Sequence, residues 1–357
     1  MAPRARARRL QAALLLLLVL VLTGGALLHW PYQGYPPPAS VFIERGMSRR
    51  AIAERLEAAG VLASRWPFLG YAALNSRRTL KAGEYLFERS LSPVEVFDKL
   101  VRGEVRLYAL VIPEGLTRWD IADRVAAAGL APRDEFLQAT ENAALIRDLA
   151  PGAENLEGYL FPDTYFFAKP SHPDVIVQTM VRQFRRVYGR LAEGDSDPRA
   201  LTPHQLVTLA SLVEKETAVA EERGLVAAVF HNRLRKKLIL ACDPTVIYAE
   251  RLAKGGSWDG RINVSDLQRN SPYNTYRHAG LPPGPIASPG RAALAAALHP
   301  PASKYLYFVS DTQGGHFFAA TSGEHSRNVA RFRRLRAQQL EDLRRQAAPK
   351  RAASPGS

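Results

Sequence analysis

Two segments of the chain repeat one pattern, Val41-Phe-Ile-Glu-Arg-Gly-Met-Ser-Arg-Arg-Ala-Ile-Ala-Glu-Arg-Leu-Glu-Ala-Ala-Gly60 and Leu110-Val-Ile-Pro-Glu-Gly-Leu-Thr-Arg-Trp-Asp-Ile-Ala-Asp-Arg-Val-Ala-Ala-Ala-Gly129. The second copy begins 69 residues after the first, and isoleucine, glycine, arginine and alanine recur at this offset. Each copy predicts a strand, a glycine turn, a Ser or Thr cap and a helix that ends at a glycine. Ser48 and Thr117 are the predicted N-caps. The predicted buried positions of the two helices are Ile52, Leu56, Ile121 and Val125.

Residues 41–130 are therefore predicted to form one α+β unit. Between the copies, residues 81–87 predict a further strand and residues 92–101 a short capped helix. The opening of each copy, I-x-x-G-x-[ST]-x-x-x-I-A, resembles the LysM carbohydrate-binding module. Any small βαβ element would also produce this opening, so both interpretations stand.

The amino terminus predicts an export segment. Four arginines lie within residues 4–9, and no Asp, Glu, Lys or Arg follows from Leu10 to Ile43. As a helix, Leu10–Leu28 would span roughly 28 Å, close to the hydrocarbon thickness of a bilayer. The arginines place the amino terminus in the cytoplasm and the rest of the chain outside. A cleaved signal peptide is the alternative, because Gly24-Gly-Ala26 supplies small residues before a cut.

The net charge of +14 is concentrated at the two ends of the chain. Residues 331–357 carry eight Lys or Arg against Glu341 and Asp342, and residues 10–330 carry only +4. Because an exported body does not meet chromosomal DNA or RNA, we expect no nucleic-acid partner. The basic tail could bind nucleic acid, but its composition fits a solvated helix near an anionic lipid surface equally well. The single cysteine, Cys242, excludes an intrachain disulfide or a CxxC zinc ribbon.

The segment Asn155-Leu-Glu-Gly-Tyr-Leu-Phe-Pro-Asp-Thr-Tyr165 places aromatic rings around two carboxylates, Glu157 and Asp163. Sugar-binding clefts use this combination, because rings stack on a pyranose and carboxylates accept bonds from its hydroxyls. An aromatic core under a turn would have the same composition. The segment therefore leaves both interpretations open.

A helix carrying two acids is predicted after Thr202-Pro-His-Gln205, which combines a Thr cap, a first-turn proline and a capping box. Glu214 and Glu216 lie on this helix, roughly 160° apart around its axis, so they cannot both face one cleft. Apolar neighbours of Glu214 would raise the pKa of its carboxyl and keep it protonated as a general acid. Ordinary surface acids would have the same spacing. The predicted buried stripe of the helix is Leu206, Ala210, Val213, Thr217 and Ala220.

Seven ordered motifs together closely resemble the YceG-like endolytic murein transglycosylases. They are residues 156–165, 210–217, 232–234, 243–248, 273–276, 280–284 and 305–309. The resemblance extends from the anchor to about residue 335. It implies a single-pass protein of the cell inner membrane, with its amino terminus cytoplasmic and its catalytic domain periplasmic. The implied partners are peptidoglycan glycan strands, with cell-wall synthases as further candidates.

The resemblance also implies the chemistry. Glu214 corresponds to the family's catalytic glutamate, which protonates the β-1,4 oxygen between N-acetylmuramic acid and N-acetylglucosamine. The carboxylate then takes the proton of the muramic C6 hydroxyl, which closes a 1,6-anhydro ring without a metal or cofactor. Breaking strands internally would limit the length of nascent glycans. Candidate substrate-binding residues are Glu157, Tyr159, Thr217, Asn232, Asp243, Thr245, Tyr273, Asn274, Thr275 and Tyr276.

The expected fold class is α+β, with a transmembrane helix, a LysM-like α+β subdomain and a mixed α+β catalytic domain. The expected boundaries are a basic arm at 1–9, an anchor at 10–30, a Pro-rich spacer at 31–40, a LysM-like domain at 41–150, a catalytic domain at 151–335 and a basic tail at 336–357. A zinc hydrolase is a rival, but no HExxH or comparable ligand pair is found. A non-catalytic peptidoglycan-binding module is another rival, and it would leave the motifs after residue 150 without a role.

Overall fold

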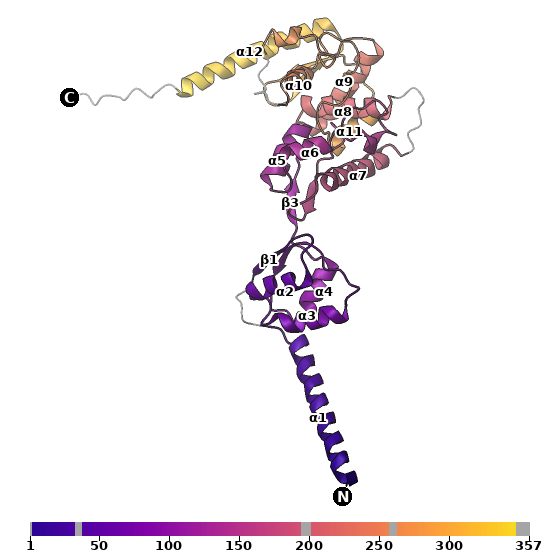
Figure 1. The fold of residues 1–357 in the computed structure, drawn as a ribbon. Helices are drawn as coiled ribbons and strands as arrows, with labels where there is room; N and C mark the ends of the chain where they lie inside the picture. Colours follow the sequence, from indigo (N-terminus) through magenta and orange to yellow (C-terminus); the bar gives the residue numbers. More distant parts are fainter. Residues whose placement is uncertain (1, 33–37, 194–200, 257–262, 348–357) are drawn as a thin grey trace, which may run out of the picture. The chain divides into compact units, whose positions relative to one another are not determined.

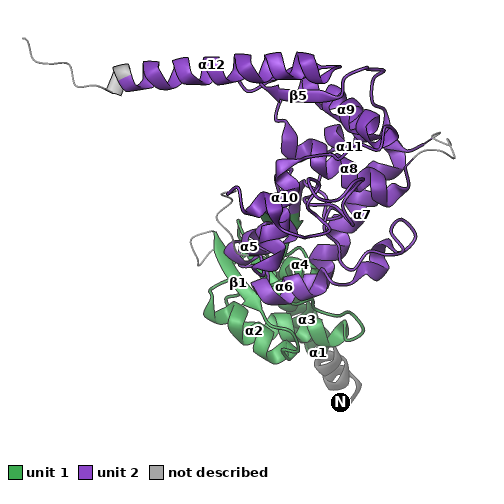
Figure 2. Ribbon diagram, turned by 90° about the horizontal axis from the view of Figure 1, so that it is seen from above, with its two compact units in different colours: residues 1–109, 166–171 green, residues 110–165, 172–357 purple. Residues whose placement is uncertain are grey.

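The computed structural model describes residues 2–32, 38–193, 201–256 and 263–347, and Figure 1 traces the chain. The chain forms two compact units, shown in different colours in Figure 2. Unit 1 comprises Met1–Ala109 and Phe166–Ser171, and unit 2 comprises Leu110–Tyr165 and His172–Ser357. The expected domain of residues 41–150 is thus divided between the units, and the second repeat copy lies in unit 2.

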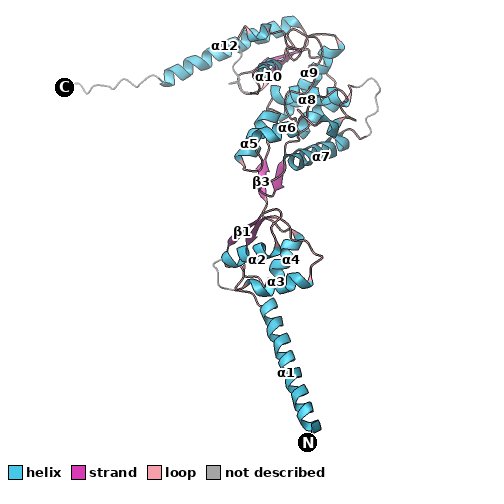
Figure 3. Ribbon diagram, in the orientation of Figure 1, coloured by secondary structure: helices cyan, strands magenta, loops and turns pink. Residues whose placement is uncertain are grey.

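Helices predominate in both units, and the described strands pair into two-stranded sheets (Figure 3). The α+β class expected from the sequence is confirmed. Helix α1 covers Ala2–His29, so it includes most of the expected basic arm. Its segment Gln11–His29 is long and apolar enough to cross a membrane by length and composition, and Leu14–Leu22 are exposed. Part of the expected spacer, residues 33–37, lies outside the described residues.

Unit 1 is built around the first repeat copy. Its elements are β1 (Ala39–Ile43), α2 (Arg49–Ala58), α3 (Arg65–Leu74), β2 (Gly83–Phe87) and α4 (Pro93–Arg102). Strands β1 and β2 are antiparallel, with Ile43 opposite Gly83 and Ala39 opposite Phe87. The predicted N-cap is confirmed, because the Ser48 side chain accepts from the Ala51 backbone N–H. The unit's core includes both predicted positions of α2, Ile52 and Leu56.

The second copy forms β3 (Tyr108–Val111) and α5 (Arg118–Ala127). Thr117 caps α5 as predicted, and Ile121 and Val125 are buried. Helix α6 (Arg133–Ala139), the 3₁₀ turn η1 (Ala143–Ile146) and strand β4 (Thr164–Phe167) follow, and β4 pairs with β3. Both copies therefore continue in the same order, as a strand, two helices and a partner strand.

The remainder of unit 2 surrounds α8 (Pro203–Glu216), which packs against α9 (Arg223–Arg235), α10 (Asp243–Ala253) and α11 (Arg291–Leu298). The capping box of α8 is confirmed. Four residues of its expected buried stripe are buried as predicted, namely Leu206, Ala210, Val213 and Thr217. The stripe is not the single buried face, because neighbours on several sides bury every residue from Leu206 to Val213. Ala220 is exposed, since α8 ends at Glu216. The other elements are α7 (Pro173–Leu191), η2 (Ala220–Glu222), η3 (Asp266–Gln268), β5 (Tyr307–Ser310), β6 (His316–Ala319) and α12 (Ser322–Ala347), whose last residues belong to the expected tail.

Candidate active site

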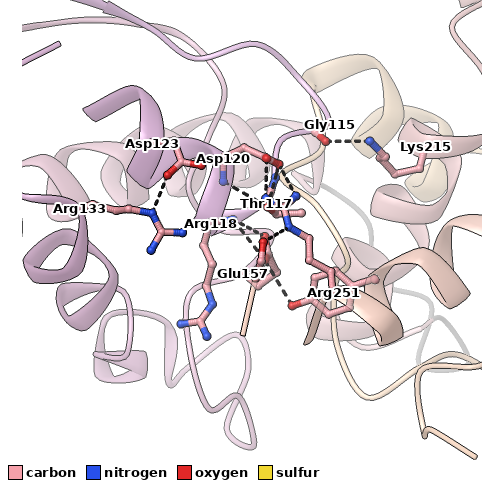
Figure 4. A network of polar contacts seen from close by, with 11 residues as sticks. Gly115, Thr117, Arg118, Asp120, Asp123, Arg133, Glu157, Lys215 and Arg251 are labelled. Atoms are coloured by element: carbon pink, nitrogen blue, oxygen red, sulfur yellow. Dashed lines mark hydrogen bonds and ion pairs between the residues drawn. The ribbon is translucent and has the colours of Figure 1, made fainter. Parts of the chain in front are cut away.

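The turn between β3 and α5 borders the carboxyl-terminal end of α8. Gly115 donates its N–H to the Ser288 carbonyl at 2.9 Å, and Ser288 donates to the Leu116 carbonyl at 2.8 Å. Lys215 of α8 donates to the Gly115 carbonyl at 3.1 Å (Figure 4). Gly115 has a φ of +75°, and a Cβ there would lie 3.6 Å from Cγ of Glu214. The turn of the second repeat copy therefore forms one side of the Glu214 site.

A polar network fixes the start of α5 and with it this turn (Figure 4). Thr117 and Asp120 form a capping box. Arg251 of α10 donates to both oxygens of Asp120, at 2.9 and 2.7 Å. Glu157 accepts from the Arg118 backbone N–H at 3.1 and 3.2 Å. Burial raises the pKa of Glu157 to about 7.

Glu214 lies in the last turn of α8, with only 7% of its side chain exposed. Its Oε2 accepts from the backbone N–H of Gly290 at 2.9 Å, at the N-cap of α11. Its Oε1 lies 3.9 Å from Nη2 of Arg223, the first residue of α9. Burial raises the pKa of Glu214 above its ordinary value, in the direction expected from the sequence. A carboxyl that keeps its proton can act as a general acid.

A second carboxylate, that of Glu114, reaches the same place from the β3–α5 turn. Its Oε2 lies 4.0 Å from the same Nη2 of Arg223. A Cβ at Gly290 would lie only 1.7 Å from Oε1 of Glu114, so glycine at 290 leaves free the space that this carboxyl occupies. The sequence motifs did not indicate Glu114, Arg223 or Gly290 as site residues. The repeat contained one indication of Glu114, because the two copies carry opposite charges at this position, Arg45 in the first and Glu114 in the second.

Glu216 contacts a different part of unit 2. Burial raises its pKa, and its carboxyl forms a hydrogen bond with Cys242, just before α10. Glu214 instead bonds to Gly290. The two acids thus have separate partners, as their phase on the helix predicted.

Most of the predicted substrate-binding side chains are buried and have partners within the chain. Tyr159 pairs with His204 Nδ1 at 2.8 Å, and Asn232 donates to the Ser303 and Tyr305 carbonyls at 2.9 and 2.8 Å. The others with such internal bonds are Glu157, Thr217, Thr245, Asn274 and Thr275. These contacts hold loops and helix ends, and a direct role in substrate binding stays a prediction.

Three of the predicted side chains keep exposed surface. Asp243 is exposed and accepts from the Tyr276 hydroxyl at 2.5 Å. Tyr276 and Tyr273 are partly exposed, and the Tyr273 ring centroid lies 4.9 Å from that of Tyr248. Within the described residues, no group of three His, Cys, Asp or Glu side chains is arranged to hold a metal ion.

Comparison with known proteins places the chain in a family. The model of the YceG-like family matches residues 41–331. The chain belongs to the YceG-like family. The match includes both repeat copies and every residue of the Glu214 site described above.

Members of this family align with most of the chain. One is the endolytic murein transglycosylase of Bacillus subtilis (strain 168), 30% identical over 327 residues, which cover 87% of this chain and 89% of the relative. The protein of the same name from Streptococcus pneumoniae (strain ATCC BAA-255 / R6) is 33% identical over 82% of this chain, and the match spans 58% of that relative. A crystal structure of a yceG-like protein from Listeria monocytogenes is 32% identical, with a TM-score of 0.54, and the match covers 82% of this chain and 99% of that one.

Proposed function

We propose that the chain is an endolytic peptidoglycan lytic transglycosylase with Glu214 as its catalytic residue. The observation that carries the proposal is a nearly buried carboxyl, held at one oxygen by the Gly290 N–H, in a chain whose relatives are named endolytic murein transglycosylases. Because Oε2 is the oxygen that accepts from Gly290, Oε1 is the oxygen available to carry a proton.

One carboxyl is sufficient for the proposed reaction. Protonated Glu214 gives its proton to the β-1,4 glycosidic oxygen of a muramic residue, and the bond from C1 to that oxygen breaks. The Glu214 carboxylate then takes the proton of the C6 hydroxyl, whose oxygen bonds to C1 and closes the 1,6-anhydro ring. Because this hydroxyl is tethered to the reacting sugar, the attack is intramolecular. Cutting strands internally would limit their length.

The remaining residues take supporting parts in the proposal. Tyr273, Tyr276 and Asp243 offer the partly exposed rings and carboxylate suited to a glycan. The buried members of the predicted set brace the loops that carry them. Unit 1, with its β1-α2-α3-β2 order, is the proposed LysM-like module. Cell-wall synthases are candidate partners.

Substitution of Glu214 tests the proposal. Glu214→Gln should reduce the release of glycan fragments by about 10²–10⁴-fold, which is the usual contribution of a positioned general acid. Glu216→Gln is the matched control and should retain substantial activity, because Glu216 has separate partners. Equal losses in two folded variants would remove Glu214 from this role.

The product distinguishes a lyase from a hydrolase. Digestion in ¹⁸O-water should give 1,6-anhydro muramic ends without ¹⁸O, formed within strands as well as at their ends. Reducing ends that carry ¹⁸O would show hydrolysis. A second carboxylate would then be required, about 5–5.5 Å away as a nucleophile or 6.5–9.5 Å away as a base.

The proposed location is the cell inner membrane, with Gln11–His29 as an uncleaved anchor, the amino terminus in the cytoplasm and both units in the periplasm. A reporter fused after Ser357 should be active only in an exported compartment, and the mature protein should retain Met1 or Ala2. An amino terminus near Leu27 would instead identify a cleaved signal peptide.

A further inference from the structure

Two carboxylates share one guanidinium at the Glu214 site. Arg223 Nη2 lies 3.9 Å from Glu214 and 4.0 Å from Glu114. The guanidinium is largely buried, with 15% of the side chain exposed, and the carboxyl of Glu214 is more buried still. Glu114 is 45% exposed, so it is the more hydrated of the two acids. The guanidinium therefore lies between one buried carboxyl group and one hydrated carboxyl group.

Backbone hydrogen bonds hold Glu114 close to Arg223 and Glu214. The Gly115–Ser288 and Ser288–Leu116 bonds hold the turn that carries it, and Lys215 holds the same turn from α8. Gly290 leaves room for the carboxyl of Glu114, where any Cβ would collide with it. The Gly290 N–H binds Glu214 from the same position. One residue thus accommodates both acids.

The charges around Glu214 act in opposite directions. Arg223 and Lys215 favour the ionised form of Glu214, as does the Gly290 N–H, and Glu114 favours the protonated form. If Arg223 faced Glu214 alone, it would stabilise the carboxylate, and a general acid would lose its proton at a lower pH. Glu114 shares the guanidinium and offsets this effect.

We propose that Glu114 and Arg223 are positioning residues that act on Glu214 in opposite directions, as an opposed pair. The charge of Glu114 offsets the charge of Arg223, so Glu214 can carry the proton that it gives to the glycosidic oxygen. The role of Glu214 as proton donor rests on the proposed function. The opposed pair itself is a property of the cluster and can be measured without turnover.

The experiment compares Glu114→Gln and Arg223→Gln in the full chain in detergent micelles. The rate of fragment release from purified glycan strands is measured against pH, and its alkaline limb reports deprotonation of the acid. Glu114→Gln should move this limb to lower pH by about one unit, since one neighbouring charge typically shifts a carboxyl pKa by this order. Arg223→Gln should move it to higher pH. Glu135→Gln, an exposed acid on α6, is the matched control and should leave the limb in place.

A second readout separates failure of this inference from failure of the proposed function. The infrared carboxyl band that disappears in Glu214→Gln titrates with Glu214 whether or not the chain cleaves glycans. Its midpoint should fall in Glu114→Gln, rise in Arg223→Gln and return toward the original value in Glu114→Asp, which restores the charge.

The outcomes are decisive in either direction. Opposite shifts of the band support the opposed pair, and opposite shifts of the band in a chain without lytic activity would count against the proposed function alone. An unmoved midpoint in folded Glu114→Gln, or shifts of the same sign in the two variants, would overturn the inference. A rate lowered equally at every pH, with the band unmoved, would also overturn it, because a merely structural role has that signature.

Discussion

The two repeat copies share their local structure almost residue for residue. Ser48 and Thr117 cap helices of ten residues, and the glycines that follow, Gly60 and Gly129, both have positive φ. The first helical arginine of each copy binds the carboxyl-terminal end of the next helix. Arg49 donates to the carbonyl of Ala72, in the last turn of α3, and to that of Ser76, just after the helix. Arg118 donates to the hydroxyl of Thr140 at the end of α6.

The copies differ at the turn and in the first helical turn. A Cβ at Gly46 would meet nothing within 4 Å, whereas Gly115 lies against Glu214. The first copy has Ala51 where the second has Asp120, which binds Arg251. One type of βα unit therefore serves as core packing in unit 1 and as part of a polar site in unit 2. A few polar positions make the difference, and the apolar pattern stays the same.

The largest expected effect tests the apolar pattern that the copies share. Ile52 and Ile121 occupy matching, buried positions. Ile52→Ala and Ile121→Ala should each lower the free energy of unfolding of their own unit by about 2–5 kcal/mol, the usual cost of truncating a buried isoleucine. Hydrogen exchange of α2 and α5 peptides would measure this. If either variant destabilised both units alike, the description of two separate compact units would be contradicted.

A somewhat smaller effect is expected from Glu157, which belongs to the polar network found in unit 2 alone. Burial gives Glu157 a pKa of about 7, above the ordinary value of 4.5, so the folded state holds an extra proton between these pH values. The free energy of unfolding of unit 2 should therefore decrease as the pH rises from about 4.5 to 7, by about 3 kcal/mol from this group. Glu157→Gln should flatten that dependence in denaturant titrations. Glu88→Gln, an exposed acid of unit 1, is the control, and an unchanged slope in Glu157→Gln would show that other groups cause it.

The smallest expected effect compares the two turn glycines. Gly46 and Gly115 have φ values of +86° and +75°, so alanine should cost each unit about 1 kcal/mol of stability. Only Gly115→Ala should also lower the rate of glycan cleavage, several-fold, because the turn that it strains carries Glu114. Thermal unfolding and fragment release measure the two effects. Equal rates in the two variants would mean that the second turn has no more to do with the site than the first.

Local signals in the sequence predicted what local interactions decide. The caps at Ser48, Thr117 and Thr202 and the buried faces of α2 and α5 follow from hydrogen-bonding chemistry and helical period, and all are confirmed. The separate partners of Glu214 and Glu216 follow from the same geometry.

These local patterns could not predict contacts between segments that are distant in the sequence. Glu114 lies 100 residues before Glu214 in the sequence, and nothing in the local pattern of either residue indicates that they meet at Gly290. The burial of α8 on several sides depends on α9, α10 and α11, so a single-stripe prediction could not describe it. Polar loop residues such as Asn274 suggested ligand contacts, and the structure gives its amide two backbone carbonyls.

The short segment Phe166–Ser171 belongs to unit 1 although the chain on either side belongs to unit 2. Lys169 of this segment lies over the Tyr108 ring, 4.0 Å from its centroid. Neither unit is therefore a single uninterrupted stretch of the gene. A fragment that ends at Ala109 would lack six residues of its own unit, and a fragment that begins at Leu110 would carry those six without their neighbours. Dissection of this protein would need a short linker in place of residues 166–171, and the excised peptide would need to be supplied separately to unit 1.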